Sequence, residues 1–155
     1  MNLVIKLKLT IRSIAMSKEE LIKQINVVIH KTTLDNVKGA PFKIRQYADT
    51  IKLLLNYPED KIVDLSHLTE WFKSNGKKNP TNIISKIESY VKTGYFPMAE
   101  DALKDPVVNA VVNLTKIANI GPAKAKELYN KFGIITIQDL RAKYSIQPDI
   151  IHDKQ

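Results

Sequence analysis

The sequence contains no cysteine, and its three histidines, at positions 30, 67 and 152, lie far apart in the chain. Without cysteine it forms no disulfide and offers no thiolate as nucleophile or metal ligand. The histidines also lack the spacing of zinc ligands. No apolar run approaches the roughly 18–20 residues of a membrane-spanning helix. These absences exclude a disulfide scaffold, a cysteine enzyme and a zinc-ligand motif, and they count against a membrane protein.

The first fifteen residues, MNLVIKLKLTIRSIA, alternate between apolar and polar side chains. A secretory signal has a continuous apolar stretch instead. We therefore expect an intracellular protein (nuclear, cytoplasmic or viral) that is neither secreted nor embedded in a membrane.

Arginine is scarce, whereas lysine is abundant. The net charge is +8, and lysine outnumbers arginine 21 to 3. An excess of positive charge indicates a polyanionic partner, although composition alone does not separate nucleic acid from a membrane surface. Lysine binds phosphate as a point charge, while bidentate reading of bases favours arginine. The composition favours contact with a phosphate backbone without sequence reading.

Helical periodicity fills the chain from residue 17 onward, and no segment has the Val/Ile alternation of a sheet. Four helices are predicted within residues 17–94, and shorter ones follow. Their starts are marked by residues that commonly cap helices, namely Ser17 with Glu20, Ser66, Thr81, Asp105 and Thr136. The pattern predicts an all-α fold.

The same pattern predicts the domain organisation. Residues 1–15 precede a clean helix start and are interpreted as an N-terminal arm or appendage. Residues 16–95 form a four-helix domain, and residues 96–155 repeat a helical pattern at smaller scale.

Two segments, KNPTNIISKIESYV and NIGPAKAKELYNKF, each place a short turn between a preceding helix and a following one. We interpret them as two helix-hairpin-helix units, of which the first has lost its glycines. In the second, a helix that starts after Gly121 and Pro122 points its positive end and its N–H groups toward an approaching anion. The alternative for this Gly-Pro pair is a plain turn between helices.

Three segments together resemble family X DNA polymerases. LTKIANIGPAKAKELYNKFGIITIQDLR is similar to the second helix-hairpin-helix of that family. PFKIRQYADTIKLLLNYP and ISKIESYVKTGYF resemble two helices of its N-terminal lyase domain, and the similarity covers about residues 17–145. The resemblance implies a four-helix lyase-type domain followed by a small helix-hairpin-helix, fingers-like subdomain. It also implies base excision repair on nicked or gapped DNA, with removal of 5′-deoxyribose phosphate through a Schiff base and β-elimination.

The family motifs assign roles to particular residues of this sequence. The Schiff-base lysine falls on Lys86, although a rival match points to Lys31. Main-chain carbonyls of Thr115, Ile117 and Ile120 correspond to a site for a monovalent cation, Na⁺ or K⁺, and the lyase chemistry itself implies no cofactor. The DNA contacts that the resemblance and its departures suggest are Lys43, Tyr47, Lys77, Lys78, Asn82, Gly121, Ala123 and Lys124.

Lys86 has a suitable setting for such chemistry. A lysine attacks an aldehyde as a neutral amine, and burial or neighbouring cations favour that form. Ile83, Ile84 and Ile87 flank it in the sequence. Without the resemblance, Lys86 is interpreted as an ordinary solvated lysine. Lys43 and Tyr47 are likewise either phosphate ligands or a surface cation and a core aromatic.

The sequence departs from the family pattern in both hairpins. Asn119 replaces a glycine of the second hairpin, and asparagine tolerates left-handed backbone. The first hairpin has Lys78-Asn79-Pro80 where glycines are expected. Beyond it, Asn82 replaces a phosphate-binding lysine and Ser85 replaces an acidic neighbour of the nucleophile. The lysines at positions 73, 77 and 78 are candidates to restore the lost charge.

No Asp-x-Asp occurs in the sequence, so the paired aspartates of a two-metal polymerase site are missing. We expect a monomer without polymerase activity, with DNA as partner and a separate palm or other repair proteins as further candidate partners. The alternative functions are a non-catalytic, sequence-independent DNA-binding module or subunit, and a basic protein-interaction domain.

Overall fold

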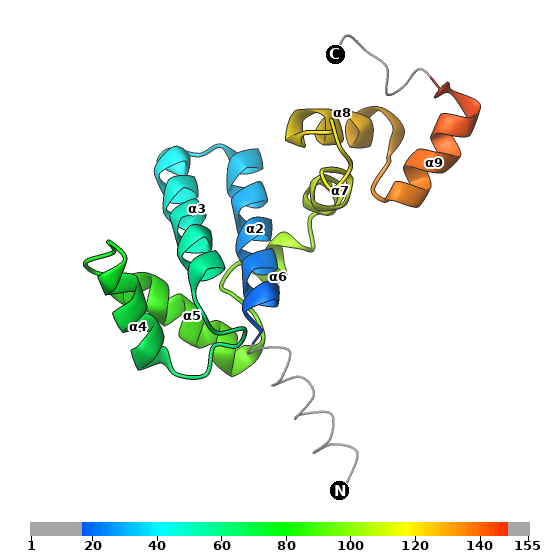
Figure 1. Ribbon diagram of the computed structural model, residues 1–155. Helices are drawn as coiled ribbons and strands as arrows, with labels where there is room; N and C mark the ends of the chain where they lie inside the picture. The colour runs from blue at the N-terminus through cyan, green and yellow to red at the C-terminus, as the bar shows by residue number, and fades with distance from the viewer. Residues whose placement is uncertain (1–16, 149–155) are drawn as a thin grey trace, which may run out of the picture. The chain divides into compact units, whose positions relative to one another are not determined.

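A computed structural model describes residues 17–148, in which helices are joined by turns and loops (Figure 1). The helices are α2 (Lys18–Asp35), α3 (Ala40–Asn56), α4 (Leu65–Ser74), α5 (Thr81–Thr93), α6 (Ala99–Ala102), α7 (Pro106–Leu114), α8 (Pro122–Phe132) and α9 (Ile137–Ile146). Within residues 17–148 there is no strand, only an isolated antiparallel bridge between Ser17 and Lys61. The all-α prediction is confirmed. The predicted arm, residues 1–15, lies outside the described range.

The chain divides into two compact units between Ala102 and Leu103. The first contains α2 to α6, and the second contains α7 to α9. The sequence placed the boundary at residue 95 instead. Phe96 and Ala99 lie in the hydrophobic core of the first unit, and α6 packs against α2. Because these apolar side chains are buried there, residues 96–102 belong structurally with the first unit.

Three of the five predicted helix caps are present. The Ser17 hydroxyl accepts a hydrogen bond from the backbone N–H of Glu20 at 3.2 Å. Asp105 caps α7 ahead of Pro106, and Thr136 forms a capping box with Asp139 at the start of α9.

The predicted caps at Ser66 and Thr81 were wrong. Asp64 caps α4 instead, because its carboxylate accepts hydrogen bonds from the backbone N–H groups of both Ser66 and His67. Thr81 is the first residue of α5 rather than its cap, and its hydroxyl donates to the side chain of Asn79 at 3.0 Å. Asp64, two positions before Ser66, takes the capping role in α4. The Thr81 hydroxyl bonds the Asn79 side chain instead of a helix N–H group.

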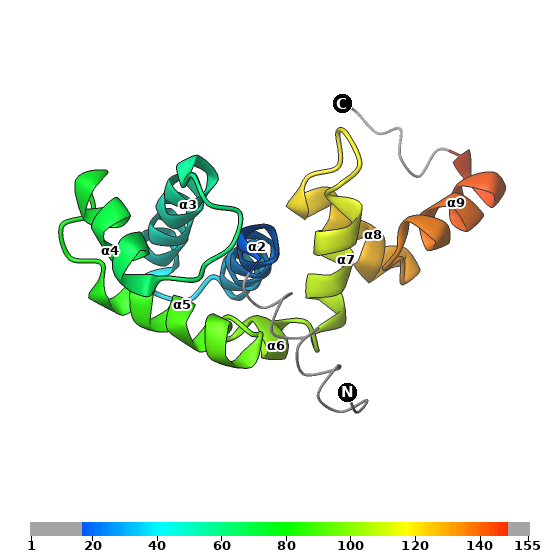
Figure 2. The same ribbon diagram turned by 60° about the horizontal axis from the view of Figure 1, so that its bottom comes forward.

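In the first unit, α2 and α3 lie side by side, and α4 contacts α5 (Figures 1 and 2). Apolar side chains from these four helices and from the segment before α6 form one core, which includes Leu21, Ile25, Val28, Leu54, Tyr57, Phe72, Ile87, Tyr90 and Phe96. The burial follows the helical spacing of these residues, so each helix turns one stripe inward.

A buried glutamine connects α2 to the chain after α5. Gln24 is only 7% exposed. Its side-chain amide donates to the carbonyl of Gly94 at 2.9 Å, and its side-chain oxygen accepts from the N–H of Phe96 at 2.7 Å. The Phe96 ring in turn packs edge-on against the ring of Tyr47, with centroids 6.0 Å apart. Gln24 therefore fixes the backbone that supports Tyr47.

The pKa of His30 on α2 is lowered by burial, since burial disfavours the charged imidazolium. Unfolded chains then bind a proton more readily than folded ones, so stability is full above the unfolded pKa of about 6.5 and is lost as the pH falls below it. We expect the melting temperature to drop between pH 7.5 and pH 5.5, and His30→Gln to make that drop smaller. Thermal melts of both proteins at the two pH values measure the difference. An equal drop in both would contradict the assignment to His30.

In the second unit, α7 and α8 pack against each other across the turn that joins them. Their contact buries apolar residues of both helices together with residues of the following segment, namely Val108, Val111, Leu114, Ala125, Leu128, Ile134 and Leu140. The side chain of Asn113 donates to the carbonyl of Ile135 at 3.2 Å. The unit therefore consists of two packed helices joined by a turn, followed by α9.

Candidate active site

Lys86 lies on α5 and reaches the side chain of Tyr47 on α3. Its Nζ donates to the Tyr47 hydroxyl at 2.9 Å and lies 5.1 Å from the centroid of the tyrosine ring. Lys86 is half-buried, and Ile83 and Ile87 on the same helix are buried. The flanking isoleucines thus belong to the core, while the ammonium of Lys86 lies among mostly polar side chains. Tyr47 is 7% exposed, so its ring belongs to the core while its hydroxyl serves the lysine.

A small pocket of about 90 Å³ contains both side chains. It is lined by Gln46, Tyr47, Thr50, Lys77, Asn79, Asn82, Ile83 and Lys86. The spacing of these residues explains why they meet: residues three or four apart on α3 and on α5 share a face, and these two faces oppose each other across the pocket. Four of the predicted site residues, Tyr47, Lys77, Asn82 and Lys86, are thus brought together.

A second pocket, of about 270 Å³, adjoins the first and shares Gln46, Tyr47, Asn82 and Lys86 with it. Its remaining lining residues are Lys31, Thr32, Asp35, Val37, Phe42, Lys43 and Met98. Lys43 and the rival nucleophile Lys31 therefore both lie beside the wall that holds Lys86. Lys78, by contrast, is exposed and lines neither pocket.

The helix ends at these pockets favour anions. Neither α3 nor α5 has a side-chain hydrogen bond at its N-cap, whereas α2, α4, α7 and α9 do. An N-terminus without a side-chain cap keeps a partial positive charge. At α3, however, the Ala40 N–H already donates to the Val37 carbonyl, and Pro41 has no N–H. Lys43 lies near the start of α3, and Asn82 lies in the first turn of α5. Together with the half-buried Lys77, these helix ends make the surface between the two pockets suitable for a phosphate.

The second hairpin has a similar uncapped start. Gly121 is the N-cap of α8 and provides no side-chain hydrogen bond. Its backbone is extended, with φ −90° and ψ 179°, so its conformation does not require glycine. Nothing lies within 4 Å of the position that a Cβ would occupy there. Ala123 and Lys124 follow in the first turn of α8, and the Lys124 ammonium lies 3.7 Å from the Glu127 carboxylate. The glycine thus leaves open space above the N–H groups of the helix start.

The turn before Gly121 includes the predicted carbonyl ligands. Asn119 takes the left-handed conformation with φ 70°, which asparagine tolerates. The Ile117 carbonyl accepts from the N–H of Ile120 at 3.2 Å, and a carbonyl oxygen that accepts one bond keeps a second lone pair. Main-chain oxygens suit a hard monovalent cation, so the donor set of Thr115, Ile117 and Ile120 fits the predicted ion. Within residues 17–148, no cluster of three or more histidine or acidic side chains is arranged to hold a metal.

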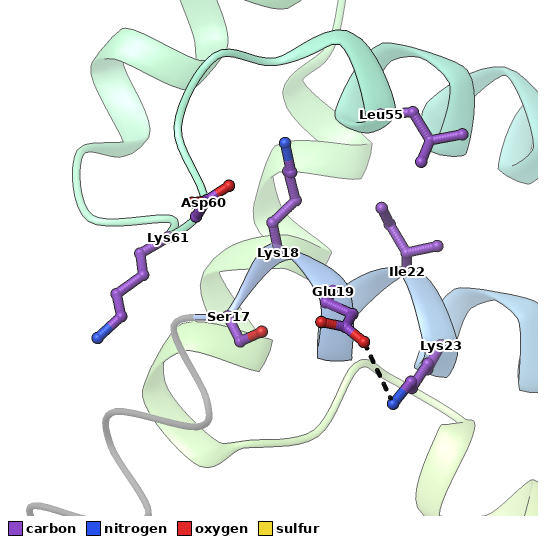
Figure 3. A pocket seen from close by; sticks show the side chains of 8 residues that line it. All are labelled: Ser17, Lys18, Glu19, Ile22, Lys23, Leu55, Asp60 and Lys61. Atoms are coloured by element: carbon purple, nitrogen blue, oxygen red, sulfur yellow. Dashed lines mark ion pairs between the residues drawn. The ribbon is translucent and has the colours of Figure 1, made fainter.

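Figure 3 shows a larger pocket, of about 550 Å³, where the start of α2 meets the segment after α3. None of the predicted site residues lines it; its lining is Ser17, Lys18, Glu19, Ile22, Lys23, Leu55, Asp60 and Lys61. Two of its lysines are engaged locally, since the Lys18 ammonium donates to the Tyr57 carbonyl and Lys23 pairs with Glu19 at 3.6 Å. Size alone therefore does not identify the candidate site.

No protein-family model matches the sequence, and no solved structure matches the chain. Of the helices between residues 17 and 148, none is both long enough and apolar enough to cross a bilayer. At the level of class, the chain is an all-α protein with two helical units.

Sequence reasoning missed several residues of the site. The pocket of about 90 Å³ is lined by Gln46, Thr50 and Asn79, among others. Thr32 and Asp35 line the adjoining pocket of about 270 Å³. Helical spacing could have found the first two, because Gln46 and Thr50 lie three and seven residues after Lys43. Asp35 gave no such signal, since its position depends on how the end of α2 packs beside α5.

Proposed function

We propose that this protein binds nicked or gapped DNA through its phosphates and removes 5′-deoxyribose phosphate by a lyase reaction at Lys86. The observation that carries the proposal is that Lys86 and Tyr47 form a hydrogen-bonded pair in a polar pocket. Lys77 and Asn82 line the same pocket, and Lys43 lines the adjoining one. Lys43, Tyr47 and Lys86 come from segments that the family resemblance assigned to one site. Asn82 stands where that resemblance expects a phosphate-binding lysine, and Lys77 is a candidate to restore the lost charge.

In this mechanism the neutral amine of Lys86 attacks the C1′ aldehyde of the opened sugar, and loss of water gives a Schiff base. Removal of a C2′ proton then allows the C3′–O3′ bond to break, which releases the sugar phosphate from the downstream strand. Hydrolysis of the Schiff base regenerates the lysine. Tyr47 orients the amine, while Lys43, Lys77 and the uncapped starts of α3 and α5 hold the phosphate.

The second unit contributes a phosphate contact at the start of α8 in this proposal. The N–H groups of Ala123 and Lys124 bind a backbone phosphate, and Gly121 allows it to approach. The carbonyls of Thr115, Ile117 and Ile120 would hold a monovalent cation, whose charge would stiffen the turn. In this proposal the protein acts as a monomer.

Borohydride trapping tests the lyase proposal. The wild-type protein is incubated with a nicked duplex that carries a 5′-deoxyribose phosphate, and sodium borohydride is added to reduce any Schiff base. A covalent protein–DNA adduct is the expected product. Salt-sensitive DNA binding without any adduct would overturn the lyase activity and leave the second candidate, a DNA-binding module, which the replacement of the family's lysine by Asn82 favours.

The start of α8 gives a separate prediction for DNA affinity. Gly121→Ala places a methyl group in the space that a phosphate would enter, while the extended backbone at this position accepts alanine without strain. Loss of one charge-assisted contact, worth about 1.5–3 kcal/mol, predicts DNA binding weaker by about tenfold or more. The melting temperature stays the same. Fluorescence anisotropy with a labelled nicked duplex measures the affinity.

Salt titrations provide the control for this variant. Gly121→Ala removes no charge, so the slope of log affinity against log salt is expected to stay constant. Lys124→Gln reduces that slope by about one if its ammonium contacts a phosphate. Lys131→Gln, at the other end of α8, serves as the matched substitution and leaves both affinity and slope unchanged. Equal affinity of wild type and Gly121→Ala would remove α8 from the interface.

A further inference from the structure

One carboxylate lines the same pocket as Lys31, Lys43 and Lys86. Among the residues that line the two adjoining pockets, Asp35 is the only one with an acidic side chain. It lines the pocket of about 270 Å³ together with Lys86, Tyr47 and Lys43. Ser85, the neighbour of the nucleophile in the sequence, has a neutral hydroxyl that is a poor proton acceptor. The site therefore offers one carboxylate as a base, and it comes from α2.

The position of Asp35 is unfavourable for the helix that carries it. Asp35 is the last residue of α2, where the partial negative charge of the helix end disfavours an acidic side chain. One of its oxygens lies 3.1 Å from the ammonium of Lys31. A lysine that precedes its acidic partner by four residues is the weaker order for a helix. This pair therefore contributes little to helix stability, while it holds a carboxylate at the pocket.

We propose that Asp35 is the general base of the lyase reaction, with Lys31 as the residue that positions it. The inference rests on the function proposed above and names the group that takes the C2′ proton. With 45% of its side chain exposed, Asp35 is accessible to a bound sugar. The ion pair through one oxygen leaves the other oxygen to accept the proton.

The elimination passes through an enamine. In the Schiff base between Lys86 and C1′, the C2′–H bond breaks and the proton passes to Asp35. The electron pair of the broken C2′–H bond forms the C1′–C2′ double bond, and the π-electron pair of the C=N bond moves to the nitrogen. That nitrogen pair then restores the C=N bond, a C2′–C3′ double bond forms, and the C3′–O3′ bond breaks. The downstream strand leaves with its 5′-phosphate, and Asp35 later returns its proton to water.

The test separates formation of the Schiff base from elimination. Asp35→Asn keeps the shape of the side chain and removes the base. Borohydride-trapped adduct is expected to form at a rate within about twofold of the wild-type rate. Single-turnover release of the sugar phosphate is expected to slow by about 100-fold or more, the usual contribution of a general base. A merely structural role would reduce both rates together.

Two further variants sharpen the result. Glu19→Gln removes the same charge from the exposed first turn of the same helix and is expected to leave both rates unchanged. Asp35→Ala is expected to recover part of its elimination rate when formate is added as an external base. A rate of sugar-phosphate release in Asp35→Asn equal to that of the wild type would overturn the role of Asp35 while leaving the lyase proposal intact. Absence of an adduct in the wild type would instead overturn the lyase activity, and the role of Asp35 with it.

Discussion

Lys86→Ala is expected to reduce borohydride-trapped adduct by about 100-fold or more, because the Schiff base needs an amine at this position. DNA affinity should change far less, since several other cations and helix ends contact phosphate in the proposed complex. The fold should survive as well, because the variant loses only the hydrogen bond between Lys86 and Tyr47, worth about 1 kcal/mol. Gel analysis of adduct on a nicked duplex, with anisotropy for affinity, measures the two effects separately.

Lys92→Ala is the matched control for this experiment. Lys92 lies on the same helix, exposed and paired with Glu88 at 3.0 Å, and it lines neither pocket of the candidate site. Its loss should leave the adduct unchanged. If adduct persists in Lys86→Ala, the chemistry belongs to another amine, and Lys31 in the adjoining pocket is the first to replace. The double variant Lys31→Ala, Lys86→Ala then decides between the two.

Gln24→Leu is expected to give a large loss of stability at a buried position that lines neither pocket of the candidate site. The leucine fills a similar volume but leaves the Gly94 carbonyl and the Phe96 N–H without their buried partner. Each unpaired group costs about 1–3 kcal/mol, so the free energy of unfolding falls by several kcal/mol. Urea denaturation measures the change. The adduct yield should fall too, because Phe96 packs against Tyr47.

Gln24→Glu separates the two hydrogen bonds. A carboxylate can still accept from the Phe96 N–H, but it cannot donate to the Gly94 carbonyl, and it adds negative charge near Glu20. We expect an intermediate stability and an adduct yield closer to that of the wild type. A Gln24→Leu protein as stable as the wild type would contradict the bridging role of this side chain.

Much of the fold followed from local patterns in the sequence. Helical periodicity and the residues at helix starts predicted the all-α fold, and the caps at Ser17, Asp105 and Thr136 were correct. Local rules failed where two acceptors compete, as at Asp64 and Ser66, because the choice depends on geometry within the turn. The boundary near residue 95 also differed from the structure, since the burial of Phe96 depends on a distant glutamine.

The candidate site divides in the same way. Lys86 and Tyr47 were predicted from the family resemblance, and the structure brings them within hydrogen-bonding distance. Composition and spacing alone could not have paired them, because they lie 39 residues apart on different helices. Asp35 and Asn79 were missed for a related reason: one is at a helix end and the other in a turn, where no periodicity marks the direction of a side chain.

The hydrogen bond between Lys86 and Tyr47 has a consequence for chemical selectivity. Cells contain many small aldehydes, and any accessible lysine can form adducts with them. The amine of Lys86 is half-buried and already donates to a hydroxyl of the core, so an incoming aldehyde has to displace that contact. Under the proposed function, a sugar phosphate would gain enough from the contacts of its phosphate with the neighbouring cations to do so, whereas an uncharged metabolite would not. The contact between Lys86 and Tyr47 would then both orient the amine and protect it from adventitious modification.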